Sequence, residues 1–485
     1  MEQENPGSAV KAKQGRDAAS GETRALWWAE ASIWTDRMVS ALGNGVKGGK
    51  WFSLIDKVIR LITLEAAWQR VARNKGAAGV DGQSVERFAY QSARYLLELH
   101  TELKAGTYRP SPVKRVEIPK GDGKTRPLGI PTVKDRIVQA ALKMVIEPIF
   151  EVQFREGSHG FRPGRGCKDA LHAVDRLLKE GNTFVVDADL KGYFDSIPHD
   201  RLMALVAGSI SDGRVLSLIE SFLHQDIMTD TARWQPDGGT PQGAVLSPLL
   251  ANLYLHPLDL LMEQSGYRMV RYADDFVILC ASEAEAKAAL RQVTAWVDAK
   301  GLTLHPDKTK VCDSRQPGQG FDFLGYRFEA GMRFVRAKSL KAFKDKVRAR
   351  TIRSRGDSLR QIVADLNPVL RGWFEYFKHA RPRLFRSSTA LSGDGCAPSC
   401  VSRRSVPAWA GARPIIEDGP MHSSRGRGCS PYRQPMQPRD TPDEETSDWR
   451  AVCGRTASTV RRAGRATFPT PIGWVGSVSQ FTRFS

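Results

Sequence analysis

The chain has 485 residues, and its 72 Lys and Arg against 53 Asp and Glu give a formal net charge of +19. This length suggests about three structural units, and the hydrophobic fraction of 41% is that of a globular protein. No run of about 18 apolar residues occurs, which argues against a spanning helix and a membrane partner. The basic balance favours nucleic acid as a partner, and a solvated basic surface explains it about equally well.

The cysteines and the first residues bear on the compartment. Seven cysteines lie far apart without a CxxC pair, which favours reduced thiols over a disulfide framework or a structural zinc site. The first twenty residues are polar and charged, so no secretory signal peptide is expected. Both observations predict a cytoplasmic protein.

The N-terminal third predicts helices followed by a hairpin. Residues 1 to about 50 are polar and glycine-rich, and the formal G-x-G-x-x-G at positions 43 to 48 is interpreted as a loop because no strand precedes it. Apolar spacing predicts one helix of about five turns from Trp51, with Leu61 and Ile62 facing inward, and a second from Val85 to Leu103. Alternation between Tyr108 and Pro131 predicts a β-hairpin with a basic tip.

The middle of the chain predicts an α+β arrangement. Helices are expected over residues 137–150 and 171–178, and a short buried strand over 183–190. Residues 269–280 predict two short strands about a tight centre. Because helices separate these strands, the sheet is expected to be mainly antiparallel. A basic helix over 338–360 precedes a helix over 366–380, which carries Leu370, Trp373, Phe374 and Phe377 on one face.

Two adjacent carboxylates occupy the centre of the predicted hairpin. Asp274 and Asp275 stand between apolar runs, and burying charge without a partner is costly. The pair therefore favours a bound cation, with an ordinary acidic turn as the alternative. Strand alternation places Asp187 and Asp189 together on one face of the strand over 183–190. If that strand lies beside the hairpin, Asp189 joins Asp274 and Asp275, and three carboxylates suit two Mg²⁺ ions for nucleotidyl transfer.

Several sequence blocks resemble those of the group II intron reverse transcriptases, which are also maturases. The resemblance runs from about Val58 to His379 in the family's order. The blocks lie at residues 70–82, 116–120 with 126–131, 158–164 (SHGFRPG), 189–195 (D-x-x-x-x-F-D), 240–252 (TPQG to LSPLLAN), 272–275 (YADD), 301–309, 323–326 (FLGY) and 372–376.

The resemblance implies a fold and a division into domains. The fold is α+β, a right-hand polymerase with fingers, palm, a partial helical thumb and a disordered C-terminal tail. The expected parts are a flexible segment over residues 1–50, an N-terminal extension and fingers over 51–180, a palm over 181–325, a partial thumb or maturase domain over 326–385, and the tail over 386–485.

The resemblance also implies roles for individual residues. Asp189, Asp274 and Asp275 are the expected catalytic metal ligands, and Mg²⁺ the expected cofactor, as two ions. Lys120 and Arg126 flank the hairpin tip, where they can hold a triphosphate, or else form a solvated basic turn. Nucleotide contacts are further expected from Phe194 as a steric gate or core aromatic, from Gln242, and from Lys308 as a proton donor or as a partner of Asp307. Gly243 is expected to let backbone approach the templating base pair.

A basic groove for template and primer is expected from scattered Lys and Arg side chains. Its members are Arg162, Arg165, Lys168, Arg336, Lys338, Lys341, Lys344, Lys346, Arg348 and Arg350. Phosphate contacts of this kind give affinity and salt dependence without sequence specificity. A solvated helix face remains the alternative for about half of them.

The implied function is RNA-directed DNA polymerisation with intron RNA binding in splicing and mobility. The expected partners are intron RNA as template, a DNA primer or target, and deoxynucleoside triphosphates, in a cytoplasmic bacterial ribonucleoprotein. The alternatives are a non-enzymatic RNA-binding maturase and a retron or defence-type reverse transcriptase. Residues 386–485 contain no lysine and four of the seven cysteines. This abrupt change resembles out-of-frame translation, and a natural low-complexity tail would look similar.

Overall fold

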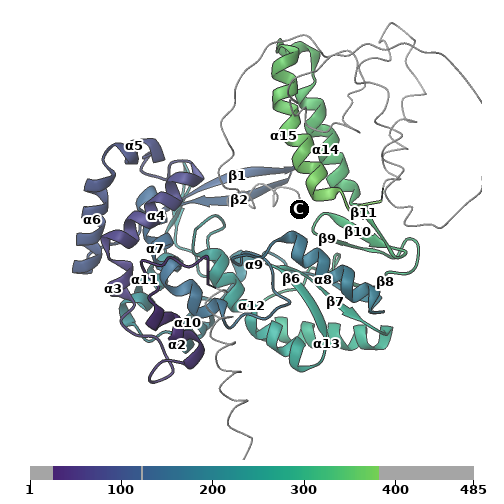
Figure 1. The fold of residues 1–485 in the computed structure, drawn as a ribbon, viewed down its shortest axis with the longest axis horizontal. Coiled ribbons are helices and arrows are strands. Elements are labelled where there is room, and N and C mark those ends of the chain that lie inside the picture. The colour runs from purple at the N-terminus through teal and green to yellow at the C-terminus, as the bar shows by residue number, and fades with distance from the viewer. Residues whose placement is uncertain (1–25, 122–123, 382–485) are drawn as a thin grey trace, which may run out of the picture. The chain divides into compact units, whose positions relative to one another are not determined.

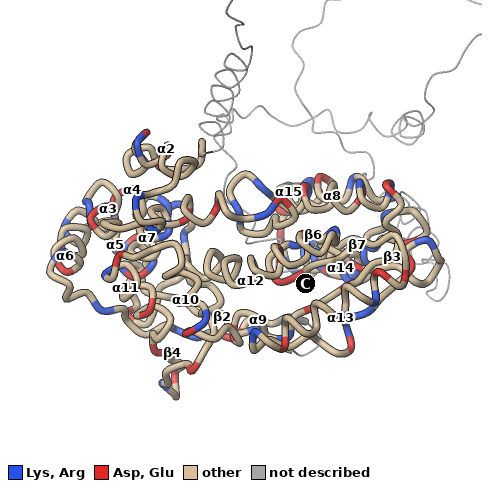
Figure 2. Tube along the Cα trace, turned by 90° about the horizontal axis from the view of Figure 1, so that it is seen from below, with Lys and Arg blue, Asp and Glu red and all other residues tan. Residues whose placement is uncertain are grey.

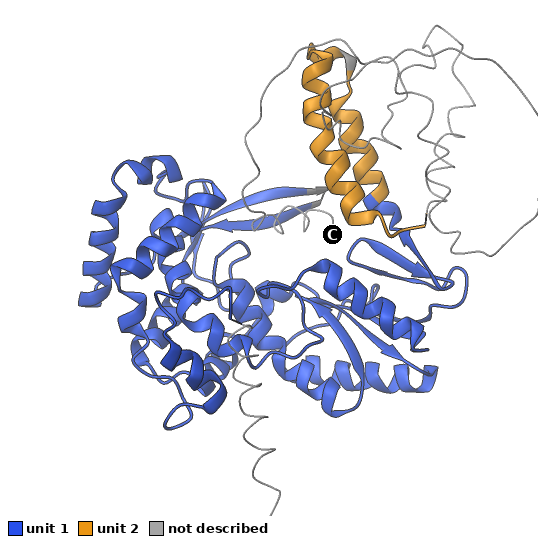
Figure 3. Cartoon of the chain, viewed as in Figure 1, with its two compact units in different colours: residues 1–339, 476–485 blue, residues 340–475 orange. Residues whose placement is uncertain are grey.

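A computed structural model describes residues 26–121 and 124–381 of the chain, which separate into two compact units. The first unit comprises residues 1–339 with 476–485, and the second residues 340–475 (Figure 3). The predicted tail over 386–485 lies outside the described residues. No helix of the described part is long and apolar enough to cross a membrane.

Short helices form the N-terminal part of the first unit (Figure 1). They are α2 (Asp36–Asn44), α3 (Ile55–Val58), α4 (Leu61–Asn74), α5 (Val85–Tyr90) and α6 (Ser92–Ala105). The predicted five-turn helix from Trp51 is therefore wrong. Arg60 has ψ 135°, which interrupts the helix between α3 and α4. Trp51 instead forms a β-bridge with Ile210, and Leu61 and Ile62 are exposed.

The second predicted helix is also divided. Gln91, with φ −131° and ψ 28°, separates α5 from α6. Ser84 begins α5 by accepting a hydrogen bond from the backbone N–H of Arg87, as N-cap serines commonly do. Phe88, Leu96 and Leu99 are buried, as the apolar spacing predicted, whereas Tyr90 is fully exposed at the end of α5.

The predicted basic hairpin is confirmed and belongs to a larger sheet. Strands β1 (Val113–Gly121) and β2 (Lys124–Ile130) pair antiparallel, and the sheet order is β2-β1-β4-β5. Strands β4 (Ile227–Met228) and β5 (Arg233–Trp234) have two residues each, too few for alternation to reveal. Helix α7 (Val133–Glu151) follows the hairpin and is buried along most of its length.

A four-stranded antiparallel sheet with the order β6-β7-β3-β8 occupies the centre of the first unit. Its strands are β3 (Phe184–Asp189), β6 (Arg268–Tyr272), β7 (Asp275–Cys280) and β8 (Lys310–Asp313). One face carries Val186, Ala188, Phe276 and Ile278, which belong to the main apolar core together with Ala289 and Val293 of α13 (Glu283–Ala299). The opposite face carries the carboxylates. The predicted strands and their antiparallel pairing are confirmed.

The remaining described elements of the first unit are further helices and a second sheet (Figure 1). They are α8 (Cys167–Lys179), α9 (Tyr193–Ser196), α10 (His199–Ser209), α11 (Gly213–Leu223), α12 (Ser247–Gln264), and a second sheet of β9 (Phe321–Phe323), β10 (Tyr326–Glu329) and β11 (Met332–Val335). Helix α8 contacts β6 and β7, and α12 contacts β6. The helices therefore support the two strands that meet at the predicted acidic turn.

Two helices make up the described part of the second unit. Helix α14 (Ala337–Arg350) begins just before the boundary, and the 3₁₀ turn η1 (Arg353–Arg355) leads to α15 (Leu359–Phe377). The ring of Trp373 stacks on that of Phe343, with centroids 4.3 Å apart. Phe343 therefore covers the ring of Trp373, and Phe377 on the same predicted face is buried. Phe374 remains half exposed, at 50%.

Candidate active site

Strand register brings the three predicted carboxylates together. Asp189 at the end of β3 is the direct partner of Asp275 at the start of β7. Side chains directly opposite each other in an antiparallel pair lie on the same face, with Cβ atoms about 5 Å apart. Asp274 stands in the two-residue turn between β6 and β7, after Ala273, whose φ is +60°. The predicted convergence of Asp189 with the hairpin turn is therefore present in the fold.

The carboxylates raise one another's proton affinity. Burial raises the pKa of Asp275 well above its usual range, and the negative charges of Asp187, Asp274 and Asp189 raise it further. Burial also raises the pKa of Asp274, with Asp189 adding to the effect, whereas the guanidinium groups of Arg126 and Arg271 oppose it. Like charges at this spacing favour protonation or a bound cation.

A lysine already neutralises one of the three groups. Lys308 Nζ lies 2.7 Å from Asp189 Oδ2. The alternative that Lys308 pairs with Asp307 is therefore replaced by a pair with the predicted metal ligand itself. The side chains are partly exposed, 55% for Lys308 and 39% for Asp189, so the pair faces solvent at the open side of the sheet.

The donor chemistry suits Mg²⁺, although the side chains are not gathered into a finished cage. Carboxylate oxygens are the ligands that a hard divalent cation prefers. Within residues 26–121 and 124–381, no three His, Cys, Asp or Glu side chains are arranged as they stand to hold a metal ion. The Lys308 contact turns one oxygen of Asp189 towards an ammonium group. Asp189, Asp274 and Asp275 therefore fit the ion by residue type and strand register, and their side chains would have to rearrange to hold it.

A chain of side-chain hydrogen bonds links the β1–β2 hairpin to Asp195 of α9. Arg126 Nε on β2 donates to Gln242 Oε1 at 3.1 Å, and Gln242 Nε2 donates to Asp195 Oδ2 at 3.1 Å. Arg126 is also close enough to lower the pKa of Asp274. Two predicted nucleotide contacts, Arg126 and Gln242, thus lie together beside the acidic turn. The side chain of Lys120, a third, lies outside the described residues.

Gly243 has a structural role beside the predicted one, which stays a prediction. Its φ is +108°, and an added Cβ would lie 2.4 Å from the carbonyl oxygen of Gly129 on β2. The backbone N–H of Gly129 donates to the carbonyl of Gln242 at 2.6 Å. Glycine is therefore required here because the loop before α12 packs directly on the fingers hairpin.

Phe194 is half-buried at the edge of the same site. Its ring packs edge-on against that of Phe161, with centroids 6.4 Å apart and an interplanar angle of 79°. The ring of Phe161 in turn packs against that of Tyr272, with centroids 6.4 Å apart. Phe161 has φ +58°, an uncommon conformation for an aromatic residue. The Phe194 ring packs against the core and keeps one part exposed, so its role as a core aromatic is present and its role as a steric gate stays a prediction.

The prediction that Arg162 lines a basic groove for template and primer is wrong. This guanidinium is buried, pairs with Glu151 at 2.8 Å, and donates to the backbone carbonyls of Arg155 and Ser158. A side chain so enclosed cannot reach phosphate. Arg165 donates to the carbonyl of Glu156, and Lys168 is exposed.

The other basic residues are partly paired. Arg336 contacts Asp322 at 3.0 Å, and Arg348 contacts Asp345 at 3.0 Å. Lys338 is exposed. Basic and acidic residues are similarly interspersed along α13 (Figure 2). Along α14, by contrast, six Lys and Arg side chains stand with one acidic residue, Asp345, so positive charge stays in excess on that helix.

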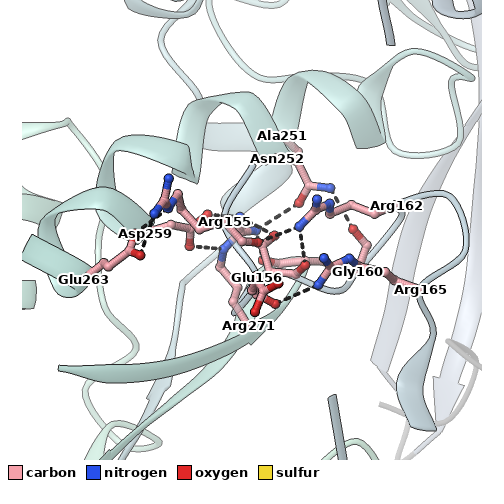
Figure 4. A network of polar contacts seen from close by, with 12 residues as sticks. Arg155, Glu156, Gly160, Arg162, Arg165, Ala251, Asn252, Asp259, Glu263 and Arg271 are labelled. Carbon is pink, nitrogen blue, oxygen red and sulfur yellow. Dashed lines mark hydrogen bonds and ion pairs between the residues drawn. The ribbon is translucent and has the colours of Figure 1, made fainter. Parts of the chain in front are cut away.

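Arg271 is the functional-site residue that the sequence interpretation missed. It is fully buried in β6, directly before Tyr272, and its guanidinium forms an ion pair with Asp259 of α12. Figure 4 shows the surrounding network, which includes Asn252 and the loop over residues 155–165. An arginine that directly follows the apolar pair Met269 and Val270 and precedes YADD is a sequence signal that could have revealed it, since a buried charge needs partners.

Two family profiles match the chain. Residues 118–328 match "Reverse transcriptase (RNA-dependent DNA polymerase)", and residues 340–389 match "Group II intron, maturase-specific domain". Protein YkfC of Escherichia coli (strain K12) is 35% identical over 321 residues, which cover 56% of this chain and 83% of that protein. The chain belongs to the group II intron reverse transcriptase/maturase family.

Other members show how far this similarity extends. The group II intron-encoded protein LtrA of Lactococcus lactis subsp. cremoris is 40% identical over 196 residues, which cover 40% of this chain and 32% of LtrA. The retron Mx162 reverse transcriptase of Myxococcus xanthus is 26% identical over 326 residues, 62% of this chain and 63% of that protein. The matched region thus spans most of YkfC and about a third of LtrA. This reverse transcriptase carries the predicted right-hand polymerase fold.

Proposed function

We propose that this group II intron reverse transcriptase copies intron RNA into DNA by adding deoxynucleotides to a primer 3′ hydroxyl. The observation that carries the proposal is the register of β3 against β7, which sets Asp189 beside Asp275 and the Asp274 turn. Arg126, Gln242 and Phe194 border the same face. Acidic metal ligands next to a cationic side chain and an aromatic ring form a complete set of parts for nucleotidyl transfer.

Asp189, Asp274 and Asp275 are the residues that would hold the two Mg²⁺ ions. When bound there, the metal would lower the pKa of the primer hydroxyl and offset the charge of the triphosphate. Asp189 ends β3 and Asp274 lies in the turn between β6 and β7, so a ligand set made from them ties the turn to the sheet. Burial and neighbouring negative charges raise the pKa values of Asp274 and Asp275. The same negative charges favour binding of a cation.

The remaining side chains bind and orient the nucleotide. Arg126 is released from Gln242 to hold a phosphate through its planar fork, and Gln242 then contacts the nucleotide or template backbone. Lys120, at the hairpin tip, adds a second cation. The Phe194 ring excludes a sugar 2′ hydroxyl by contact. Lys308 moves from Asp189 to the leaving pyrophosphate and donates a proton there.

We also propose the division of the chain predicted from its sequence, with the fingers over 51–180, the palm over 181–325 and a thumb or maturase part over 326–385. The match of residues 340–389 to the maturase-specific domain favours a second activity, in which the protein binds intron RNA and assists splicing. Intron RNA, a DNA primer or target, and deoxynucleotides are the partners, in a ribonucleoprotein.

One experiment separates polymerase from a purely RNA-binding maturase. The purified full chain is given a DNA primer annealed to an RNA template, with deoxynucleotides and Mg²⁺, and product length is measured beside binding to a folded group II intron RNA. We expect RNA-templated extension that EDTA abolishes. Tight intron binding without extension under every template and nucleotide condition would refute the polymerase and leave the maturase.

A further inference from the structure

We propose that Arg271 is a positioning residue, which holds the Ala273–Asp274 turn in the conformation that nucleotidyl transfer needs. This inference rests on the proposed polymerase function. Arg271 does not face the carboxylate site. It acts from behind the turn, through a guanidinium that is buried completely.

Each of the five N–H groups of Arg271 has an acceptor (Figure 4). Nε donates to Asp259 Oδ1 at 2.7 Å, and Nη2 donates to the other oxygen of Asp259 and to Ser158 Oγ at 2.8 Å. Nη1 donates to Asn252 Oδ1 at 2.9 Å and to the carbonyl oxygen of Ala273 at 2.9 Å. A planar fork with all its donors used has one orientation, so the Ala273 carbonyl is held at one place.

The loop over residues 155–165 also contacts this turn. An added Cβ on Gly160 would lie 2.2 Å from the backbone nitrogen of Ala273, so the loop is in direct contact with the turn. The loop is itself fixed, because the N–H of His159 donates to the carbonyl of Arg271 and the N–H of Arg271 donates to the carbonyl of Gly157, both at 2.8 Å. Asn252 Nδ2 also donates to the carbonyl of Gly160 at 2.7 Å.

These contacts converge on the peptide that precedes Asp274. Ala273 has φ +60°, a left-handed conformation that costs energy for a residue with a Cβ and persists only where its surroundings impose it. The Ala273 carbonyl and the Asp274 nitrogen belong to one planar peptide. Fixing the carbonyl therefore fixes the plane of this peptide and, with it, the position of the Asp274 Cα.

Stability alone is a weak reason for this arrangement. A buried ion pair often contributes little net stability relative to apolar residues of the same volume, because both charges must be desolvated. What these contacts do supply is a fixed position for the Ala273–Asp274 peptide. A misplacement of about 1 Å in a reacting group can lower a rate about a hundredfold.

The test compares Arg271→Lys and Ser158→Ala with Tyr108→Phe in the full chain. Lysine keeps the charge opposite Asp259 and loses the planar fork. Ser158→Ala removes one acceptor and is the milder change. Tyr108→Phe is the matched control, because it removes a buried hydrogen bond to Asp135 on α7, outside this network.

Three quantities are measured for each variant: the melting temperature, the Mg²⁺ dependence of single-nucleotide addition on an RNA template, and Mn²⁺ binding by water proton relaxation without nucleotide. Arg271→Lys should reduce the maximal rate about 10- to 100-fold. It should also raise the Mg²⁺ concentration for half-maximal rate about 10-fold and weaken Mn²⁺ binding about 10-fold. Ser158→Ala should move both in the same direction by about fivefold or less, as for one hydrogen bond. Tyr108→Phe should lower the melting temperature only.

The inference is overturned if metal binding and the Mg²⁺ curve of Arg271→Lys match the wild type and its rate falls only with the folded fraction. If Arg271→Lys does not fold, an unchanged Mg²⁺ curve for Ser158→Ala overturns it. A wild-type chain without extension contradicts the proposed function instead. In that case, Mn²⁺ binding still decides whether Arg271 positions the turn.

Discussion

Lys308 and Asp189 form an ion pair at the carboxylate-bearing face of the β6-β7-β3-β8 sheet, with Nζ 2.7 Å from Oδ2. Lys308 comes from the loop before β8 (Lys310–Asp313), and Asp189 ends β3. An exposed pair of this kind contributes at most about 1 kcal/mol to stability. Its position matters more than its strength, because the ammonium group contacts an oxygen that a metal ion would need.

Lys308→Gln should therefore separate stability from catalysis. We expect an unfolding free energy within about 1 kcal/mol of wild type, a lower Mg²⁺ concentration for half-maximal extension, and a lower maximal rate because the proton donor is lost. Single-nucleotide addition across a Mg²⁺ series measures both kinetic effects. Lys287→Gln on α13, which breaks an exposed pair with Glu283, is the control. An unchanged rate and Mg²⁺ curve for Lys308→Gln would contradict the assigned role.

Phe194→Val should raise the incorporation of ribonucleotides relative to deoxynucleotides. The smaller side chain leaves room for a 2′ hydroxyl where the exposed part of the ring now lies. The measurement is the ratio of the two single-nucleotide rates on one RNA template. Tyr193→Phe is the control, since it removes a buried hydrogen bond to the Ala251 carbonyl and keeps its ring. An unchanged ratio for Phe194→Val would mean that the ring serves core packing alone.

Asp135 should make stability depend on pH. Burial raises the pKa of this carboxyl to about 6, above the unfolded value of about 3.9, so the folded state binds the proton more tightly. Stability from this group is therefore present below about pH 4 and lost as pH rises through 6.

Asp135→Asn removes this titration. From pH 4 to pH 8 the unfolding free energy of the variant should improve relative to wild type by up to about 3 kcal/mol. Denaturant unfolding of both proteins at several pH values provides the comparison. A difference that stays constant with pH would show that Asp135 titrates normally in the fold.

RNA binding should be strongly salt-dependent. Replacing Lys341, Lys344 and Arg348 on α14 by Gln should reduce the slope of log affinity against log salt by about 2 to 3, if each neutralises one phosphate. Filter binding to intron RNA over a salt series gives the slope. Lys287→Gln with Arg291→Gln on α13 should leave it nearly unchanged. Equal slopes for wild type and the α14 variant would remove that helix from the interface.

Local patterns predicted the central sheet well. Alternation in β3 and the apolar arms around Asp274 and Asp275 gave both the strands and the shared face. The break at Arg60 was missed because Leu61 and Ile62 continue the helical period while pointing to solvent. Apolar spacing reports what could be buried, and tertiary packing decides what is.

The carboxylates of the candidate site could be predicted from the sequence, whereas the roles of the buried arginines near it, Arg162 and Arg271, could not. Arg162 was expected to contact phosphate because it is a basic residue in a glycine-containing loop. Its actual partner, Glu151, could not be recognised from the sequence. Arg271 was passed over although it interrupts the apolar run before YADD, and its partner Ser158 lies 113 residues away in sequence. Contacts between separate segments need the fold before they can be assigned.

Single-turnover deoxynucleotide addition by Asp189→Asn and Asp274→Asn, on an RNA template with Mg²⁺, tests the central claim most directly. Removing one ligand of the metal pair should lower the rate about a thousandfold or more, which corresponds to about 4 kcal/mol of lost transition-state stabilisation. Melting temperatures should stay equal or rise, because like-charge repulsion is relieved. Asp187→Asn, on the same strand face opposite Val277, should stay within about tenfold of wild type. Near-wild-type addition by Asp189→Asn or Asp274→Asn would contradict the account.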